Sequence, residues 1–126
     1  MKTAKILLVD ENTTITNIYS YLLYKEGYQV VTTHNGVKAL EKLHQESFDL
    51  IITDITIKNR NGHTLLEEIS EQFPLLPKIA MTDNLSEIVK QFAFSLGAFA
   101  LIEKPCGSAI LLTCIKRSLK EVRWYQ

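Results

Sequence analysis

The chain has 126 residues, which is the size of one ordinary domain. Hydrophobic residues make up 46% and charged residues 22%, a globular balance that excludes disordered, collagen-like and coiled-coil chains. Lys and Arg together number 14, as do Asp and Glu, so the formal net charge is zero. That balance offers no electrostatic basis for binding nucleic acid or a membrane surface.

Two features of the sequence bear on where in the cell the protein is located. Cys106 and Cys114 are the only cysteines, and their spacing matches no zinc motif, so we expect reduced thiols. No signal peptide precedes the first predicted strand, and no apolar run approaches the length of a membrane span. The sequence therefore predicts a cytoplasmic protein without a membrane segment.

Short apolar runs recur along the chain, and polar residues close most of them. Continuous runs of this kind suit strands that are buried on both faces, as in a parallel sheet covered by helices. A fifth run is more polar and is expected to form an edge strand. In chain order the predicted strands are Ile6–Val9, Tyr28–Thr33 (the edge strand), Leu50–Ile52, Ile79–Met81 and Phe99–Ile102.

The segments between these strands carry the apolar spacing of helices. The first helix is expected to bury Ile18 and Tyr19 within its apolar face. Asn84 and Glu87 form a loose capping box at the start of the fourth helix, and Gly97 is expected to end it. The expected helices cover residues 15–22, 37–44, 66–73, 85–96 and 110–122.

Strand and helix patterns thus alternate five times, which predicts a (βα)₅ arrangement of the α/β class. Right-handed crossovers would place helices on both sides of a doubly wound, five-stranded parallel sheet. No repeat, low-complexity stretch or linker interrupts the sequence. Residues 1–126 are therefore expected to form a single domain.

Charged and hydroxyl residues follow the predicted strands. Asp10 and Glu11 follow the first strand, and Asp54 follows the third. Thr82 follows the fourth strand, and Lys104 follows the fifth. In open parallel sheets, ligands bind at the carboxyl ends of the strands. If the first and third strands are neighbours, the three carboxylates converge on one small concavity.

Such a group of carboxylates needs a positive partner, because each like-charged pair costs roughly 1 kcal/mol at a partly exposed site. Mg²⁺ binds through carboxylates, waters and phosphate oxygens, and Lys104 adds a fixed positive charge. Asp54 is ionised at neutral pH and, beside Mg²⁺, is a competent nucleophile for phosphorus. Thr82 and Lys104 would then stabilise charge on the phosphoryl oxygens.

The same residues resemble the response-regulator receiver domain, and the resemblance covers nearly the whole chain. A single Asp or one Lys-Pro pair would be weak evidence, whereas five ordered elements at matching spacings are specific. These elements are Ile6–Glu11, Phe48–Asp54, Met81–Thr82, Gly97–Ala98 and Glu103–Pro105. The resemblance implies a flavodoxin-like fold with strand order 2-1-3-4-5.

The resemblance also implies a function, a phosphorylation-activated switch in a two-component phosphorelay. The donor would be a phosphohistidine on a sensor histidine kinase or phosphotransfer protein, and the output would pass to an unknown downstream protein. The domain would catalyse its own phosphorylation and dephosphorylation and would not otherwise be an enzyme. The implied residues are Asp54 as phosphoacceptor; Asp10, Glu11, Asp54 and the backbone carbonyl of Thr56 as Mg²⁺ ligands; Thr82 and Lys104 at the phosphoryl group; and a cis peptide between Lys104 and Pro105.

Three positions depart from the family pattern. Lys58 stands where Pro is common, and the loop that it begins adds positive charge through Lys58 and Arg60. Asp83 follows Thr82 where Ala or Gly is usual, so its carboxylate either caps the next helix or crowds and repels the incoming phosphoryl group. Leu101 replaces the aromatic residue that usually reports phosphorylation.

These departures support an alternative hypothesis, a pseudo-receiver that acts as a phosphorylation-independent interaction module. A small phosphatase working through an aspartyl-phosphate ranks third, because no second acid or base stands beside Asp54. Taken singly, the site residues also have ordinary interpretations. Asp10 and Glu11 could begin a loop with Asn12 capping the next helix, and Asp54 could be a turn residue.

Overall fold

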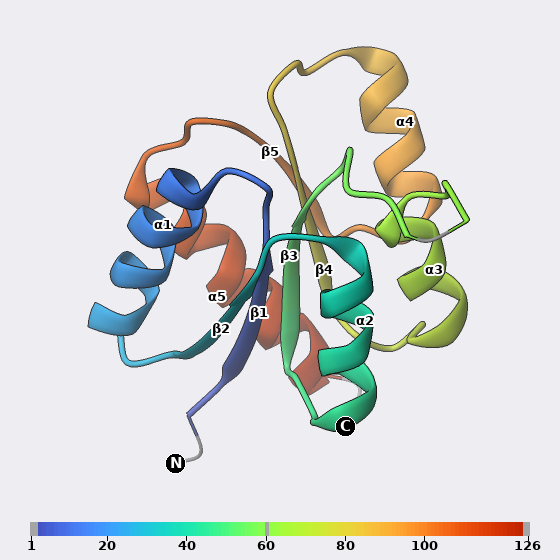
Figure 1. Cartoon of the computed structure of the whole chain (residues 1–126). Helices are drawn as coiled ribbons and strands as arrows, with labels where there is room; N and C mark the ends of the chain where they lie inside the picture. The colour runs from blue at the N-terminus through green and yellow to red at the C-terminus, as the bar shows by residue number, and fades with distance from the viewer. Residues whose placement is uncertain (1–2, 60, 125–126) are drawn as a thin grey trace.

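The structure is a computed structural model, and it describes residues 3–59 and 61–124, with side chains described as far as Lys120. Strands and helices alternate along these residues as the sequence predicts (Figure 1). In chain order the elements are β1 (Lys5–Val9), α1 (Thr13–Lys25), β2 (Gln29–Thr33), α2 (Gly36–Gln45), β3 (Leu50–Asp54), α3 (Leu65–Gln72), β4 (Lys78–Thr82), α4 (Glu87–Ser95), β5 (Ala100–Glu103) and α5 (Ser108–Trp124).

The strands form one parallel sheet of order β2-β1-β3-β4-β5, which confirms the predicted flavodoxin-like topology. β2 lies at an edge of the sheet, as its more polar sequence predicts. β1 and β3 are neighbours, and Val9 pairs with Thr53 near their carboxyl ends. The residues that follow these two strands are therefore brought together at one edge of the sheet.

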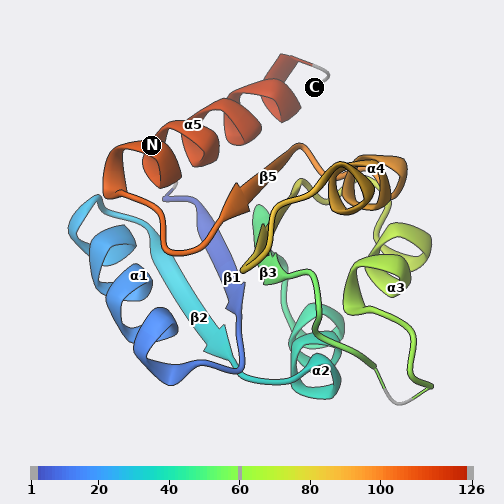
Figure 2. The same ribbon diagram turned by 90° about the horizontal axis from the view of Figure 1, so that it is seen from above.

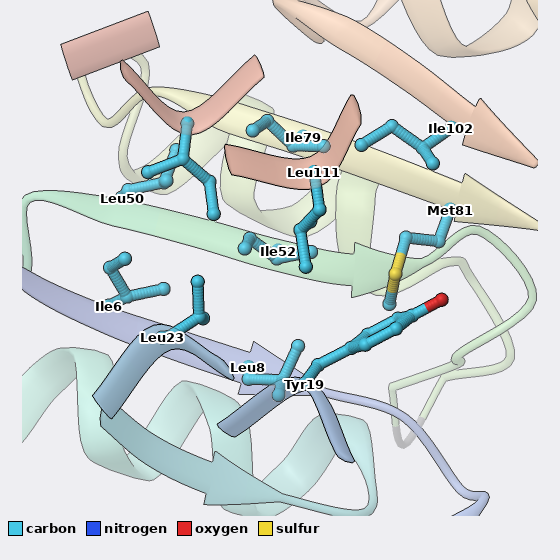
Figure 3. Packing of buried hydrophobic residues seen from close by; sticks show 11 residues of the cluster. Ile6, Leu8, Tyr19, Leu23, Leu50, Ile52, Ile79, Met81, Ile102 and Leu111 are labelled. Carbon is cyan, nitrogen blue, oxygen red and sulfur yellow. The ribbon is translucent and has the colours of Figure 1, made fainter. Parts of the chain in front are cut away.

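Helices cover both faces of the sheet: α1 and α5 lie on one side, and α2, α3 and α4 lie on the other (Figure 2). On the first side, Tyr19 of α1 and Leu111 of α5 pack with Leu8, Ile52 and Met81 of the strands (Figure 3). Every residue of β3 and β4 is buried. This double burial explains the continuous apolar runs in the sequence.

α1 is rotated about its axis relative to the prediction. The helix buries Thr16, Tyr19 and Leu23, whereas Ile18 is 51% exposed, so the expected burial of Ile18 is wrong. Thr16 can occupy the buried stripe because its hydroxyl donates to the Thr13 carbonyl, 3.0 Å away, and also contacts the His34 ring. Thr16, a polar residue whose hydroxyl is hydrogen-bonded, therefore lies on the buried face of α1, where the apolar spacing predicted only hydrophobic residues.

The start of α4 also differs from the prediction. Ser86 is the N-cap, and its side chain accepts a hydrogen bond from the backbone N–H of Val89. Asn84 lies in the preceding turn, where its N–H donates to the Thr82 hydroxyl. The helix ends as expected, because Gly97 adopts φ +86°, which residues with a side chain rarely adopt.

Other expectations about the chain are confirmed. Cys106 and Cys114 are free thiols, and the peptide between Lys104 and Pro105 is cis. Asn12 caps α1 by accepting hydrogen bonds from two backbone N–H groups. Over the described ranges, no helix combines the length and apolar character needed to cross a bilayer.

The amino end of α2 packs against the loop that follows β3. Gly36 is buried at this contact, and a Cβ atom placed on it would clash with the backbone carbonyl of Lys58. Lys58 is also bridged to Thr64 in antiparallel fashion. The absence of a side chain at Gly36 therefore lets the loop after β3 approach α2 closely.

We predict that Gly36→Ala lowers the free energy of unfolding by about 1–3 kcal/mol, because the new methyl group overpacks this contact. Urea denaturation of both proteins would measure the change. Gly107→Ala is the control, since a Cβ at that position meets nothing within 4 Å. The free energy of unfolding should fall by less than about 1 kcal/mol in this variant. Equal losses in the two variants would contradict the packing explanation.

Candidate functional site

The ammonium group of Lys104 lies between two buried carboxylates at the carboxyl ends of the strands. Asp10, directly after β1, is 2% exposed, and Asp54, the last residue of β3, is 5% exposed. Lys104 Nζ donates to Asp10 Oδ2 at 2.7 Å and also to Asp54 Oδ2. The backbone N–H of Lys104 donates to the Thr82 carbonyl at 2.8 Å, which fixes the lysine beside the end of β4. The predicted meeting of these three side chains is confirmed.

The remaining carboxylate oxygens accept hydrogen bonds from local turns. Asp54 Oδ1 accepts from the Thr56 backbone N–H at 2.8 Å and from the Thr56 hydroxyl at 2.6 Å. Asp10 Oδ1 accepts from the Asn12 N–H at 2.9 Å. All four oxygens of the two carboxylates thus have a donor, as buried charges require.

The pKa values follow from these contacts. Burial by itself raises the pKa of Asp54, but hydrogen bonds from Lys104 and Thr56 outweigh burial and lower the pKa below its ordinary value. For Lys104 the directions are reversed. Burial by itself lowers the pKa of Lys104, but the hydrogen bonds and charges of Asp10 and Asp54 outweigh burial and raise the pKa above its ordinary value. Asp54 is therefore ionised at neutral pH, and Lys104 is positively charged.

The third carboxylate does not join the other two. Glu11 is exposed, and among the described residues no three His, Cys, Asp or Glu side chains gather into a group that could hold a metal ion. The expected convergence of Asp10, Glu11 and Asp54 is therefore present only for Asp10 and Asp54. The reason is local: Glu11 begins the loop and points to solvent while Asp10 turns back to Lys104.

Thr82 is buried at the end of β4, and its hydroxyl lies in the turn that follows. The hydroxyl accepts from the Asn84 N–H at 3.1 Å and donates to the Asn84 carbonyl at 3.3 Å. Asp83 is 81% exposed at its side chain, and its Oδ1 lies 3.6 Å from Lys104 Nζ. Since Ser86 caps α4, Asp83 does not take the capping role considered for it.

The other two departures from the family pattern are Lys58, in the loop after β3, and Leu101, in β5. Lys58 is exposed, and Arg60, the second expected charge of its loop, lies outside the described residues. Asn59 organises this loop, since its N–H donates to the His63 carbonyl at 2.8 Å and its side chain hydrogen-bonds Glu68. Leu101 of β5 is partly buried and packs against the apolar cluster beneath α4.

Two contacts were not anticipated from the sequence. One is the bond from the Thr56 hydroxyl to Asp54; a Thr two residues after an Asp is a turn signal that points to it. The other is the approach of Asp83 to Lys104, which joins residues from different strand ends. No local pattern reports such a pairing, because it depends on how β4 and β5 lie in the sheet.

Comparison with known proteins identifies this arrangement. A family model for the response regulator receiver domain matches residues 6–116. The chain belongs to this family. The receiver domain acts in two-component signalling, which implies a histidine kinase partner in general. Receivers typically bind Mg²⁺ and are phosphoacceptors rather than enzymes of the usual kind.

Several solved structures resemble nearly the whole chain. A CheY-like receiver domain protein from Methanospirillum hungatei is 32% identical, with a TM-score of 0.91, and the match covers 99% of this chain and 100% of that one. The chemotaxis response regulator CheY4 of Vibrio cholerae is 29% identical, with a TM-score of 0.84 and coverage of 93% and 99%. NtrX from Brucella abortus is 27% identical with a TM-score of 0.90; the match covers 98% of this chain and 28% of that longer one.

The lowered pKa of Asp54 predicts acid sensitivity of the fold. The folded state favours the ionised form of Asp54. The contribution of this carboxylate to the free energy of unfolding is therefore complete above about pH 5 and is lost as the pH falls through the folded-state pKa. The difference in unfolding free energy between wild type and Asp54→Asn should therefore fall between pH 7 and pH 3. Urea titrations at stepped pH would measure it, and parallel pH curves for the two proteins would contradict the expectation.

Proposed function

We propose that this receiver domain accepts a phosphoryl group on Asp54 from a phosphohistidine of a sensor kinase or phosphotransfer protein, in a Mg²⁺-dependent reaction. The observation that carries the proposal is the buried contact of Lys104 with Asp10 and Asp54 at the strand ends. This contact supports the proposal, because Asp54 as an ionised nucleophile would have beside it a cation that can stabilise negative charge on a phosphoryl group.

The transfer needs no general base. A carboxylate oxygen of Asp54 attacks phosphorus, the new P–O bond forms, and the P–N bond to the donor imidazole breaks. The imidazole leaves with the electron pair of that bond, and its nitrogen takes up a proton from solvent water. Lys104 then neutralises a phosphoryl oxygen, and the Thr82 hydroxyl exchanges its 3.3 Å bond to the Asn84 carbonyl for another phosphoryl oxygen.

The donor set around Asp54 fits Mg²⁺. Its ligands would be oxygens alone, and two buried carboxylates share a single ammonium group, so one negative charge is left uncompensated. We assign Asp10, Asp54 and the backbone carbonyl of Thr56 as residues that would hold the ion, and Glu11 as a fourth that would have to turn from solvent toward the site on binding. When bound, Mg²⁺ would supply positive charge for the phosphoryl oxygens.

In the proposed signalling step, Lys104 exchanges its contact with Asp10 for a contact with the phosphoryl group. In the structure Lys104 binds both carboxylates, whereas the phosphorylated site would draw it toward the phosphoryl group and away from Asp10. Such a change at the ends of β4 and β5 would shift an equilibrium between two conformations of the domain. We propose that residues 1–126 act as one such switch and that the protein catalyses no other reaction.

Intact mass after incubation with acetyl phosphate and Mg²⁺ tests the proposal. The wild type should gain one phosphoryl group, and Asp54→Asn should gain none, because the amide is not a nucleophile for phosphorus. Asp49→Asn, at the amino end of β3, is the matched control and should be phosphorylated like the wild type. No gain, under conditions that phosphorylate another receiver domain, would favour the pseudo-receiver, a use of the fold without phosphorylation.

Mg²⁺ should stabilise the protein, since a ligand that binds only the folded state raises its stability by about 2.7 kcal/mol at one hundred times the dissociation constant. Thermal unfolding with millimolar Mg²⁺ and with a chelator would show a higher midpoint with the metal. Asp10→Asn should reduce this difference, and Asp49→Asn should leave it unchanged. The metal assignment fails if Mg²⁺ shifts the midpoints of wild type and Asp10→Asn equally.

A further inference from the structure

Lys104 contacts a third carboxylate besides the two that the proposed reaction uses. Asp83 Oδ1 lies 3.6 Å from Lys104 Nζ. The side chain of Lys104 is 5% exposed, whereas that of Asp83 is 81% exposed. Of the carboxylates within ion-pair distance of Lys104 in the described part of the chain, Asp83 is the exposed one. Its charge is therefore close to the buried ammonium and open to solvent.

The charges around Lys104 are unbalanced. Three carboxylates face one ammonium group, which leaves two net negative charges before any phosphodonor arrives. Asp10 and Asp54 are each held by further hydrogen bonds from their own turns. Asp83 has no structural task in α4, since Ser86 provides the cap. Its charge therefore acts mainly on Lys104 and on whatever approaches Lys104 from solvent.

We propose that Asp83 is a specificity-determining residue that slows phosphorylation of the site by free dianionic phosphodonors. This inference rests on the proposed function of Asp54. A free dianion must approach Lys104 past the Asp83 carboxylate and is repelled. A monoanionic donor is repelled less, and a phosphohistidine on a docked protein is held at the site by contacts elsewhere. The receiver thus selects protein donors over small dianionic metabolites.

The test compares two small donors of different charge at pH 7, with Mg²⁺ present throughout. Acetyl phosphate is largely a dianion at this pH, and phosphoramidate is largely a monoanion. Asp83→Asn keeps the shape of the side chain and removes its charge, so its phosphorylation by acetyl phosphate should be about five-fold faster than that of wild type. Phosphorylation by phosphoramidate should change less than about two-fold. Intact mass against time gives both rates.

Two further variants separate charge from other effects. Asp83→Glu retains the negative charge and should discriminate between the donors as the wild type does. Glu87→Gln removes a neighbouring exposed carboxylate in the first turn of α4 and should leave both rates unchanged. Raising the ionic strength should speed the wild-type reaction with acetyl phosphate more than that of Asp83→Asn, since salt screens exposed charges.

The possible outcomes are distinct. Equal acceleration with both donors in Asp83→Asn would overturn the inference and indicate a steric opening of the site. Unchanged rates with both donors would overturn it as well, while phosphorylation of Asp54 would still stand. If neither donor phosphorylates wild type or any variant, the proposed function fails and the inference fails with it. A shift in the ratio of the two rates, confined to Asp83→Asn, supports the inference.

Discussion

The site depends on one interaction, the placement of the Lys104 ammonium between Asp10 and Asp54. All three side chains are almost fully withdrawn from water, and charges in that condition are tolerated only when they are paired and hydrogen-bonded. Removing Lys104 leaves two buried carboxylates without a cation, whereas removing Asp10 or Asp54 leaves one Asp–Lys pair. This constraint ties the ends of β1, β3 and β5 together, and it explains why residues so far apart in the sequence must occupy fixed positions.

The sheet and its two apolar layers meet that constraint. Parallel pairing of β1 with β3 brings Asp10 beside Asp54, and pairing of β4 with β5 continues through the bond from the Lys104 N–H to the Thr82 carbonyl. Apolar side chains from the helices pack on both faces and hold the strands in register. Among described residues the single buried side-chain oxygen or nitrogen without a partner is Thr33 Oγ1, in the last residue of β2.

The same arrangement describes a resting receiver domain. Lys104 is shared between two carboxylates, so a phosphoryl group on Asp54 would compete with Asp10 for it. Leu101 stands where the family usually has an aromatic reporter, so a phosphorylation signal of the proposed kind would have to use other motions. Asp83 adds a charge at the entrance that the family pattern lacks, and we connect it with the choice of donor rather than with the transfer step itself.

The sequence by itself determined the order of the elements and the α/β class, because buried parallel strands leave continuous apolar runs. It also predicted Asp10, Asp54, Thr82 and Lys104 as candidate site residues, because these residues follow the strands at the edge where open parallel sheets bind ligands. The sequence wrongly predicted that Ile18 of α1 is buried, because apolar spacing does not show that Thr16 can be buried once its hydroxyl is hydrogen-bonded. It also misplaced the cap of α4, because the turn before this helix makes Ser86 the N-cap. Only the tertiary structure decided that Glu11 turns to solvent and that Asp83 reaches Lys104. Contacts between different strand ends depend on how the strands are placed in the sheet, and no local pattern in the chain records that placement.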